Sequence, residues 1–310
     1  MGAKLLILCP GQGGQHAGMF DMAGTDAAGA ALLGGLRARG AHAKPPGDDA
    51  AASAPLFANR SAQPLIVAAT LAMWEALREH APPPALVAGY SIGELAAWSV
   101  AGALAPLEAV ALADVRAELM DRCLAAHPGQ ALLAVSGLPP PRAAGLTAHC
   151  GFHLAIINGE DACIIGGPDS GVAQAVFLLA AAGARTTLLP VEIASHTPYM
   201  ADAVAPFAEA LRAAPLHAAA TPVLAGISAA RLDSREQAIE HLSRQLSEPV
   251  IWDECMDACA EAGITVALEL GPGAALARMM QARHPGIACR SVADFRSLDG
   301  IRAWLRRHCG

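Results

Sequence analysis

The sequence predicts an α/β fold, with a mostly parallel sheet covered by helices on both faces. Apolar residues make up 54% of the 310 residues and charged residues only 16%, which favours a large buried core. Strand-like and helix-like segments alternate along much of the chain, as in parallel sheets. A short apolar segment, Ala85–Ala88, runs through a G-x-S-x-G turn at 89–93 into a helix-like segment. This length suits one large domain that carries a smaller inserted one.

The first third of the chain begins with an apolar segment, Lys4–Cys9, that predicts a strand. A glycine-rich turn, Pro10–Gln15, follows it. Residues 22–50 are rich in Gly, Ala and Asp, with breakers at Pro45–Gly47, and predict a small helix and loops. Dense helix formers over Pro64–His80 predict a helix that ends before three consecutive prolines.

After a predicted helix over Leu107–Ala126, the middle of the chain consists of short strand-like and helix-like segments. We expect strands at Ala131–Ser136, Phe152–Ile157, Ala162–Ile165 and Arg185–Val191, and helices at Pro141–Cys150 and Ser170–Ala182. This βαββαβ order is that of the ferredoxin-like unit. It predicts an insert at 129–192 between two parts of an α/β-hydrolase-like domain, 1–128 and 193–310.

The remaining chain returns to the alternation of the large domain. Helices are expected at Tyr199–Ala213, Arg235–Leu246 and Ile251–Ala262, and strands at Pro222–Ile227 and Thr265–Leu270.

Composition excludes several classes of protein. The net charge of −7 argues against a general nucleic-acid binder. No apolar run reaches the roughly 18 residues that span a bilayer, and the apolar N-terminus is too short for a signal peptide. The eight scattered cysteines form no C-x-x-C pair, which favours reduced thiols and a cytoplasmic protein. Cys255 and Cys259 lie one helical turn apart, but without a further nearby ligand we interpret them as structural.

The G-x-S-x-G turn has the context of a nucleophile elbow, with a strand before it and a helix after it. Ser91 would project at the helix N-terminus, where free backbone N–H groups can hold a developing oxyanion. The alternative is a glycine-rich turn whose serine only caps the helix.

A serine nucleophile needs a base, and His196 is the best candidate among eleven histidines. It follows the last strand of the predicted insert, at a junction where side chains point into an active-site mouth. A packing or capping histidine is the alternative. Asp114 or Asp121 could complete a triad, but a Ser–His dyad oriented by a backbone carbonyl fits equally well.

The chain resembles the malonyl-CoA:acyl-carrier-protein transacylase family over nearly its whole length. The matching landmarks are Pro10–Gln15 with P-G-Q-G-x-Q, Gly89–Glu94 with G-H-S-x-G-E, Arg116, Ser195–His196, Gln245, and Glu269–Gly273 with E-x-G-P-G. The resemblance implies that Ser91 is acylated and that His196 activates the incoming thiol. It also implies an oxyanion hole from the backbone N–H groups of Gln12 and Ile92, and a backbone carbonyl of Gln245 that orients His196.

Arg116 has a physical reason of its own in this resemblance. A malonyl group differs from an acetyl group by one carboxylate, which a guanidinium can bind through two charge-assisted hydrogen bonds. Taken without the resemblance, Arg116 would be a surface residue of a helix. The family implies malonyl-CoA as donor, no permanently bound cofactor, and the prosthetic-group thiol of an acyl-carrier protein as acceptor.

One departure from the family pattern suggests that the chain belongs to a particular branch of the family. Tyr90 replaces the histidine that usually precedes the serine. Together with Asn59–Pro64 and Leu95–Trp98, it resembles the transacylase (epsilon) subunit of malonate decarboxylase, which implies a carrier with a phosphoribosyl-dephospho-CoA arm and further decarboxylase subunits as partners. Ser195 before the histidine is typical of malonyl-type rather than methylmalonyl-type members.

Three functions stay open at this point. The first is a malonyl transacylase, which serves either malonate decarboxylase or, as the alternative, general fatty-acid or polyketide synthesis. A serine hydrolase or thioesterase would share the elbow but has no use for Arg116 or Gln12. A non-catalytic subunit that docks a carrier protein could use the basic residues Arg302, Arg306 and Arg307.

Overall fold

A computed structural model describes residues 2–38 and 56–310. Its large sheet has the strand order β11-β10-β1-β2-β7-β8, in which only the β7–β8 pair is antiparallel. The strands are β1 (Leu5–Cys9), β2 (Leu86–Gly89), β7 (Val223–Leu224), β8 (Arg231–Leu232), β10 (Val266–Glu269) and β11 (Ala288–Ser291). The predicted α/β fold with a mostly parallel sheet is confirmed.

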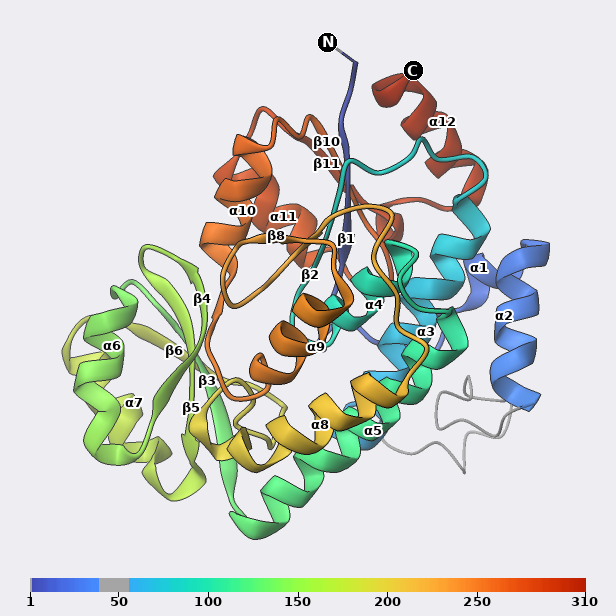
Figure 1. Ribbon diagram of the computed structural model, residues 1–310. Coiled ribbons are helices and arrows are strands. Elements are labelled where there is room, and N and C mark those ends of the chain that lie inside the picture. The colour runs from blue at the N-terminus through green and yellow to red at the C-terminus, as the bar shows by residue number, and fades with distance from the viewer. Residues whose placement is uncertain (1, 39–55) are drawn as a thin grey trace.

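Helices cover both faces of this sheet (Figure 1). They are α1 (Asp21–Gly24), α2 (Ala27–Ala38), α3 (Asn59–Leu77), α4 (Gly93–Val100), α5 (Pro106–Ala126), α8 (Ala201–Ala213), α9 (Arg235–Arg244), α10 (Trp252–Glu261), α11 (Ala275–Arg283) and α12 (Leu298–Cys309). None of the helices in the described part of the chain combines the length and apolar character that a bilayer span requires.

Strand β1 shows why a run of apolar residues was needed here. Leu5 and Ile7 point into the core formed with α2, α3, α4 and α5, whereas Leu6 and Leu8 point into a second core with α10 and α11. A strand buried on both faces cannot alternate apolar and polar residues. The central strand therefore fixes the sheet between two helical layers.

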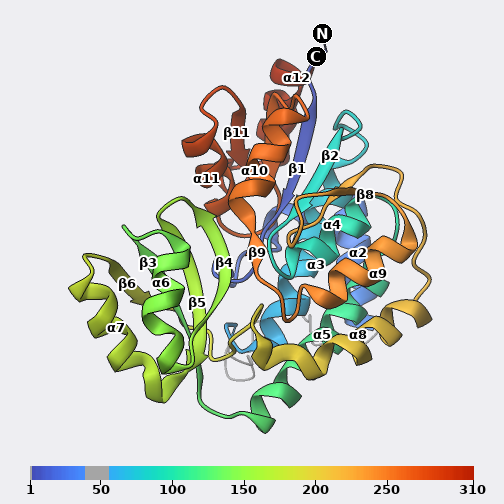
Figure 2. The same cartoon turned by 60° about the vertical axis from the view of Figure 1, so that its left-hand side comes forward.

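A second sheet forms the small subdomain, which stands apart from the large sheet in both views (Figures 1 and 2). Its order is β6-β3-β5-β4-β9. The elements are β3 (Gln130–Ser136), α6 (Pro140–Thr147), β4 (His153–Gly159), β5 (Ala162–Pro168), α7 (Val172–Ala181) and β6 (Arg185–Leu188). The four consecutive strands have the ferredoxin-like arrangement that the βαββαβ pattern predicted. The proposed insert boundaries, 129 and 192, enclose all six elements.

The fifth strand of this sheet, β9 (Val250–Ile251), was not predicted. It comes from the chain after the insert and pairs in parallel with Ile156–Ile157 of β4. The structure therefore ties the small subdomain to the segment that follows α9. A two-residue strand has no periodic signal. The helix predicted over Ile251–Ala262 is present as α10, but it begins one residue later because Ile251 belongs to β9.

Other boundaries also differ from the predicted ones. Helix α3 begins at Asn59, five residues before the predicted start, and contains Pro64. The strand predicted over Pro222–Ile227 is reduced to two residues, and the one over Arg185–Val191 ends at Leu188. The loops predicted after residue 38, including Pro45–Gly47, lie outside the described residues.

The start of α4 packs directly against the end of β1, and Gly93 permits this approach. A Cβ atom on Gly93 would lie 2.1 Å from the carbonyl oxygen of Cys9 and 2.6 Å from that of Pro10. Both obstacles are backbone atoms, so they cannot rotate away. Close packing therefore requires glycine at the second glycine position of the G-x-S-x-G turn.

We expect Gly93→Ala to lower the free energy of unfolding by about 1–3 kcal/mol, the usual effect of overpacking a core. Gly145→Ala is the matched control, because nothing lies within 4 Å of the added Cβ. That exposed position of α6 should gain about 0.5–1 kcal/mol from better helix propensity. Urea unfolding of both variants measures the effect, and equal stabilities would contradict the packing argument.

Candidate active site

Ser91 lies in the turn between β2 and α4 with the backbone in the left-handed region, at φ 55°. The tight turn depends on Gly89 as well as Gly93, since a Cβ on Gly89 would lie 2.3 Å from the backbone of Gly93 and Glu94. The N–H of Tyr90 donates to the carbonyl of Cys9 at 3.0 Å and holds the turn against β1. This strained geometry is that of a nucleophile elbow.

The Ser91 hydroxyl faces a histidine. Its Oγ lies 2.7 Å from Nε2 of His196, and Nδ1 of His196 lies 2.6 Å from the backbone carbonyl of Gln245. A carbonyl only accepts, so Nδ1 carries the proton and Nε2 is free to accept one from Ser91. The structure thus brings together three residues from distant parts of the sequence in the geometry of a nucleophile and its base.

The backbone of His196 is also held in a left-handed conformation, at φ 62°. Its N–H donates to the carbonyl of Leu246 at 2.8 Å, so two hydrogen bonds join His196 to the segment after α9. The side chain is fully buried. Burial lowers the pKa of His196 to about 3, and the positive charge of Arg116 adds to this effect, while the Gln245 carbonyl opposes it. The imidazole is therefore neutral at physiological pH, as a base must be.

The dyad interpretation fits this geometry better than a triad. Nδ1 of His196 faces a peptide carbonyl rather than a carboxylate. Asp121, one of the two aspartates considered from the sequence, instead accepts from Nδ2 of Asn59 at 2.8 Å.

The two amides expected to form an oxyanion hole lie beside the elbow. Gly11 packs so closely on it that an added Cβ would lie 2.8 Å from the carbonyl of Tyr90. Within the described residues, the backbone N–H groups of Gln12 and Ile92 donate no hydrogen bond. Ile92 is the residue before α4, whereas Gln12 lies in the turn after β1. Free backbone donors of this kind can stabilise an oxyanion.

Arg116 is buried, with only 2% of its surface exposed, so the surface position expected without the family resemblance is wrong. It lies in the middle of α5, and its Nη1 donates to Oε1 of Gln63 at 2.6 Å. Nη2 is 3.4 Å from Oε1 of Gln245. Burial lowers the Arg116 pKa to about 10, which leaves the group cationic at neutral pH. Among the described residues, Arg116 makes hydrogen bonds only to neutral groups, so this buried cation can accept a carboxylate ligand.

Two buried polar residues of this site were not singled out from the sequence. Gln63 holds Arg116 and donates to Oδ1 of Asn59 at 2.5 Å. Glu94, in the first turn of α4, accepts from Nε2 of Gln245 at 2.5 Å and from the N–H of Gly226 at 2.9 Å. The available signal was a polar residue directly before an apolar helical run, since Gln63 precedes Pro64–Ala69 and Glu94 precedes Leu95–Trp98.

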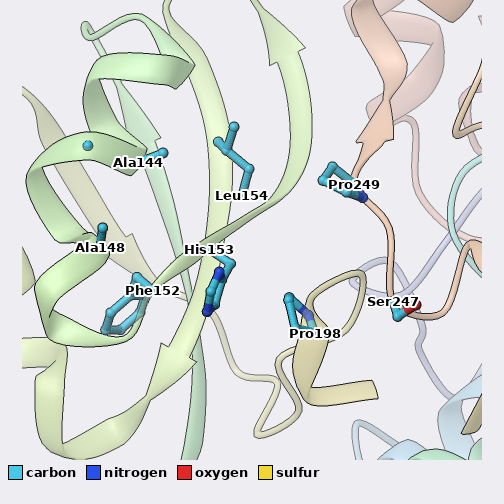
Figure 3. A pocket seen from close by; sticks show the side chains of 9 residues that line it. Ala144, Ala148, Phe152, His153, Leu154, Pro198, Ser247 and Pro249 are labelled. Carbon is cyan, nitrogen blue, oxygen red and sulfur yellow. The ribbon is translucent and has the colours of Figure 1, made fainter. Parts of the chain in front are cut away.

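Tyr90 joins the elbow to the small subdomain. Its hydroxyl donates to Oδ1 of Asn158 on β4 at 3.2 Å, and its ring lies edge-on to Trp252 with centroids 5.3 Å apart. A pocket of about 450 Å³ opens between α6 and the start of β4 on one side and Pro198, Ser247 and Pro249 on the other (Figure 3). Neither Ser91 nor His196 lines it.

All eight cysteines are free. Within the described residues, no group of three or more His, Cys, Asp or Glu side chains could hold a metal ion. Cys255 and Cys259 are buried on α10, in agreement with the structural interpretation.

Comparison with known proteins finds relatives that are named as transacylases or polyketide synthases. The chain is 28% identical over 246 residues to the malonyl CoA-acyl carrier protein transacylase of Bacillus subtilis, with 77% of each protein covered. It is 33% identical over 225 residues to polyketide synthase GfsB of Streptomyces halstedii, which covers 70% of this chain but only 4% of that much longer protein.

Structural similarity extends over nearly the whole chain. An acyl carrier protein S-malonyltransferase from Vibrio cholerae superposes with a TM-score of 0.86 at 27% identity, covering 96% of this chain and all of that one. Residues 7–295 match the model of the acyl transferase domain family. The chain therefore belongs to this acyltransferase family.

Proposed function

We propose that the protein transfers a malonyl group from malonyl-CoA to the thiol of an acyl-carrier protein. The observation that carries this proposal is the double role of Gln245. Its backbone carbonyl orients the base His196, and its side chain contacts Arg116, the residue expected to bind the malonyl carboxylate. A serine nucleophile and a buried cation are thereby held in one hydrogen-bonded unit. The names of the relatives from Bacillus subtilis and Vibrio cholerae support the same activity.

The first half-reaction forms an acyl-enzyme. Nε2 of His196 takes the proton of Ser91 as Oγ attacks the thioester carbonyl of malonyl-CoA. The N–H groups of Gln12 and Ile92 stabilise the oxyanion of the tetrahedral intermediate. Collapse of the intermediate breaks the C–S bond, and protonated His196 gives its proton to the CoA sulfur.

The second half-reaction reverses these steps with another thiol. His196 takes the proton of the carrier thiol, whose sulfur attacks the malonyl ester on Ser91. The same amides hold the second oxyanion, and Ser91 leaves with the proton from His196. The reaction is therefore a ping-pong exchange without net hydrolysis.

Arg116 supplies selectivity for malonyl groups in this mechanism. A malonyl carboxylate can form charge-assisted hydrogen bonds to the guanidinium. An acetyl group would leave the buried cation without an anionic partner, which penalises binding of that substrate. A hydrolase or thioesterase acting on a neutral acyl group would gain nothing from this residue.

The choice of carrier is a finer proposal. We propose malonate decarboxylase as the setting, with its carrier and further subunits as partners, because Tyr90 and its neighbours resemble that branch. The contact between Tyr90 and Asn158 supports a distinct role for this position, since it links the elbow to the small subdomain. A general fatty-acid or polyketide transacylase is the alternative, and an acceptor screen distinguishes them: a phosphopantetheine carrier against one with the dephospho-CoA-type arm.

The free cysteines support a cytoplasmic location, which we also propose.

Incubation with malonyl-CoA should add one malonyl group to Ser91, because Oγ is within hydrogen-bonding distance of its base. Intact mass spectrometry and peptide mapping measure the modification, and Ser91→Ala should show none. Addition of carrier protein should then discharge the malonyl group onto the carrier thiol. A protein that hydrolyses malonyl-CoA at the same rate with and without a carrier would contradict acyl transfer.

Arg116→Ala should reduce kcat/KM for malonyl-CoA by about 30-fold or more, the effect of removing one member of a buried charge pair. The rate with acetyl-CoA should fall much less. Arg60→Ala is the matched control, because Arg60 is 38% exposed and pairs with Glu118 on the surface. An unchanged ratio of malonyl to acetyl transfer in Arg116→Ala would remove its proposed role.

At saturating malonyl-CoA, the rate of Ser91 acylation should stay level as the pH falls from about 7 to about 5. His196 has a pKa lowered to about 3, so the basic form persists throughout this range. For an imidazole with the ordinary pKa of about 6.5, the fraction in the basic form would fall about 30-fold by pH 5. Single-turnover rapid quench at each pH measures the rate, and a decline centred near pH 6.5 would overturn the assignment.

A further inference from the structure

Glu94 is a buried carboxyl group that the acyl-transfer mechanism does not use. It lies three residues after Ser91 and has no exposed surface. One oxygen, Oε2, accepts both of its hydrogen bonds, from Nε2 of Gln245 and the N–H of Gly226. The other oxygen, Oε1, is buried and has no hydrogen-bond partner among the described residues. A proton could therefore be added at Oε1 without breaking either hydrogen bond.

The amide of Gln245 separates Glu94 from Arg116. Its Nε2 donates to the carboxylate, and its Oε1 faces the guanidinium. This orientation is the one that both neighbours require, because a guanidinium only donates and an ionised carboxylate only accepts. Glu94 and Arg116 thus balance each other's charge within one buried unit.

A malonyl carboxylate would disturb this balance. With Glu94 ionised, the unit would hold two negative charges and one positive charge. Burying a charge that lacks a counter-charge is costly, and buried groups respond by changing protonation state. Glu94 is the acidic group in this unit with an oxygen free to take a proton.

We infer that Glu94 takes up one proton at Oε1 when a malonyl carboxylate binds beside Arg116, so that the buried site keeps its net charge. The proton comes from solvent through the buffer, and an O–H bond forms on Oε1 while no bond in the protein breaks. The proton returns to solvent when the malonyl group leaves on its carrier. This inference rests on the proposed function, and in particular on the role of Arg116.

The other titratable groups that surround Glu94 do not change charge near neutral pH. Burial and the charge of Arg116 lower the His196 pKa to about 3, so the imidazole stays neutral. Burial raises the pKa of the Cys255 thiol on α10 well above its ordinary value, so it also stays neutral. Arg116, with its pKa lowered to about 10, stays cationic. Burial raises the pKa of Glu94 to about 7, against the hydrogen bonds from Gly226 and Gln245 and the charge of Arg116.

The sign of the pH dependence follows from this uptake. Below pH 7 Glu94 is already largely protonated, so malonyl-CoA affinity should be level there. Above pH 7 each binding event must recruit a proton, and the affinity should fall by up to about tenfold per pH unit. Acetyl-CoA brings no carboxylate, so its affinity should not follow this pattern.

Isothermal titration calorimetry of the Ser91→Ala protein tests the inference, because binding is then separated from acylation. Titrations near pH 8 in buffers of different ionisation enthalpy give the number of protons bound. We expect the protein to take up close to one proton more on binding malonyl-CoA than on binding acetyl-CoA. The comparison with acetyl-CoA corrects for protons that the CoA part itself gains or loses. Ser91→Ala/Glu94→Gln should lose this extra proton and the pH dependence of malonyl-CoA affinity. Ser91→Ala/Glu118→Gln is the matched control, since Glu118 pairs with Arg60 and Arg122 on the surface, and it should keep the extra proton.

A second measurement needs no change at Glu94. Near pH 8, where Glu94 is ionised in the free protein, infrared difference spectra of the Ser91→Ala protein should show a protonated carboxyl band on addition of malonyl-CoA and none on addition of acetyl-CoA. Equal proton uptake with the two ligands, or an extra proton that persists in Glu94→Gln, would overturn the inference. If Ser91→Ala prefers malonyl-CoA without extra uptake, only the inference fails. If it shows no preference for malonyl-CoA, the proposed role of Arg116 fails as well.

Discussion

The hydrogen bond from Nδ1 of His196 to the carbonyl of Gln245 is the contact on which the site depends. It sets the tautomer of the imidazole, and only that tautomer leaves Nε2 able to accept from Ser91. A peptide carbonyl serves as well as a carboxylate for this purpose, because it cannot donate and its position is fixed by the backbone. The segment after α9 is held in turn by the pairing of β9 with β4, so the small subdomain contributes to the alignment of the base.

Backbone strain at the two reacting residues is the cost of this alignment. Ser91 and His196 are two of three non-glycine residues with positive φ among those described. Such conformations persist only where the surroundings over-determine them. The hydrogen bonds from Tyr90 to Cys9 and from His196 to Leu246, together with close packing around Gly89 and Gly93, supply that constraint.

Local patterns in the sequence were sufficient to predict the elbow and the four consecutive strands of the small sheet, but not its fifth strand, β9. A strand, a glycine-rich turn and a helix follow one another within 85–101, and the βαββαβ order is read from short consecutive segments. The side-chain role of Gln245 could not be predicted in this way. Its contacts with Arg116 and Glu94 span 129 and 151 residues, and no local pattern encodes such distances. The residues around Arg116 predicted a surface position, because its helix has charged residues on either side at Asp114 and Glu118, and only the family resemblance gave it a binding role.

The same burial shifts the three ionisable groups of the site in different directions, and the arrangement uses each shift. Loss of solvent keeps His196 neutral, so that Nε2 carries no proton, and it makes Glu94 easier to protonate. A direct ion pair between Glu94 and Arg116 would instead fill the guanidinium donors that a malonyl carboxylate needs. The Gln245 amide keeps the two charges apart yet coupled, so the arginine can be both stable in the unliganded protein and available to substrate. Selectivity for a dicarboxylic acyl group then depends on the amide between the charges as much as on the arginine itself.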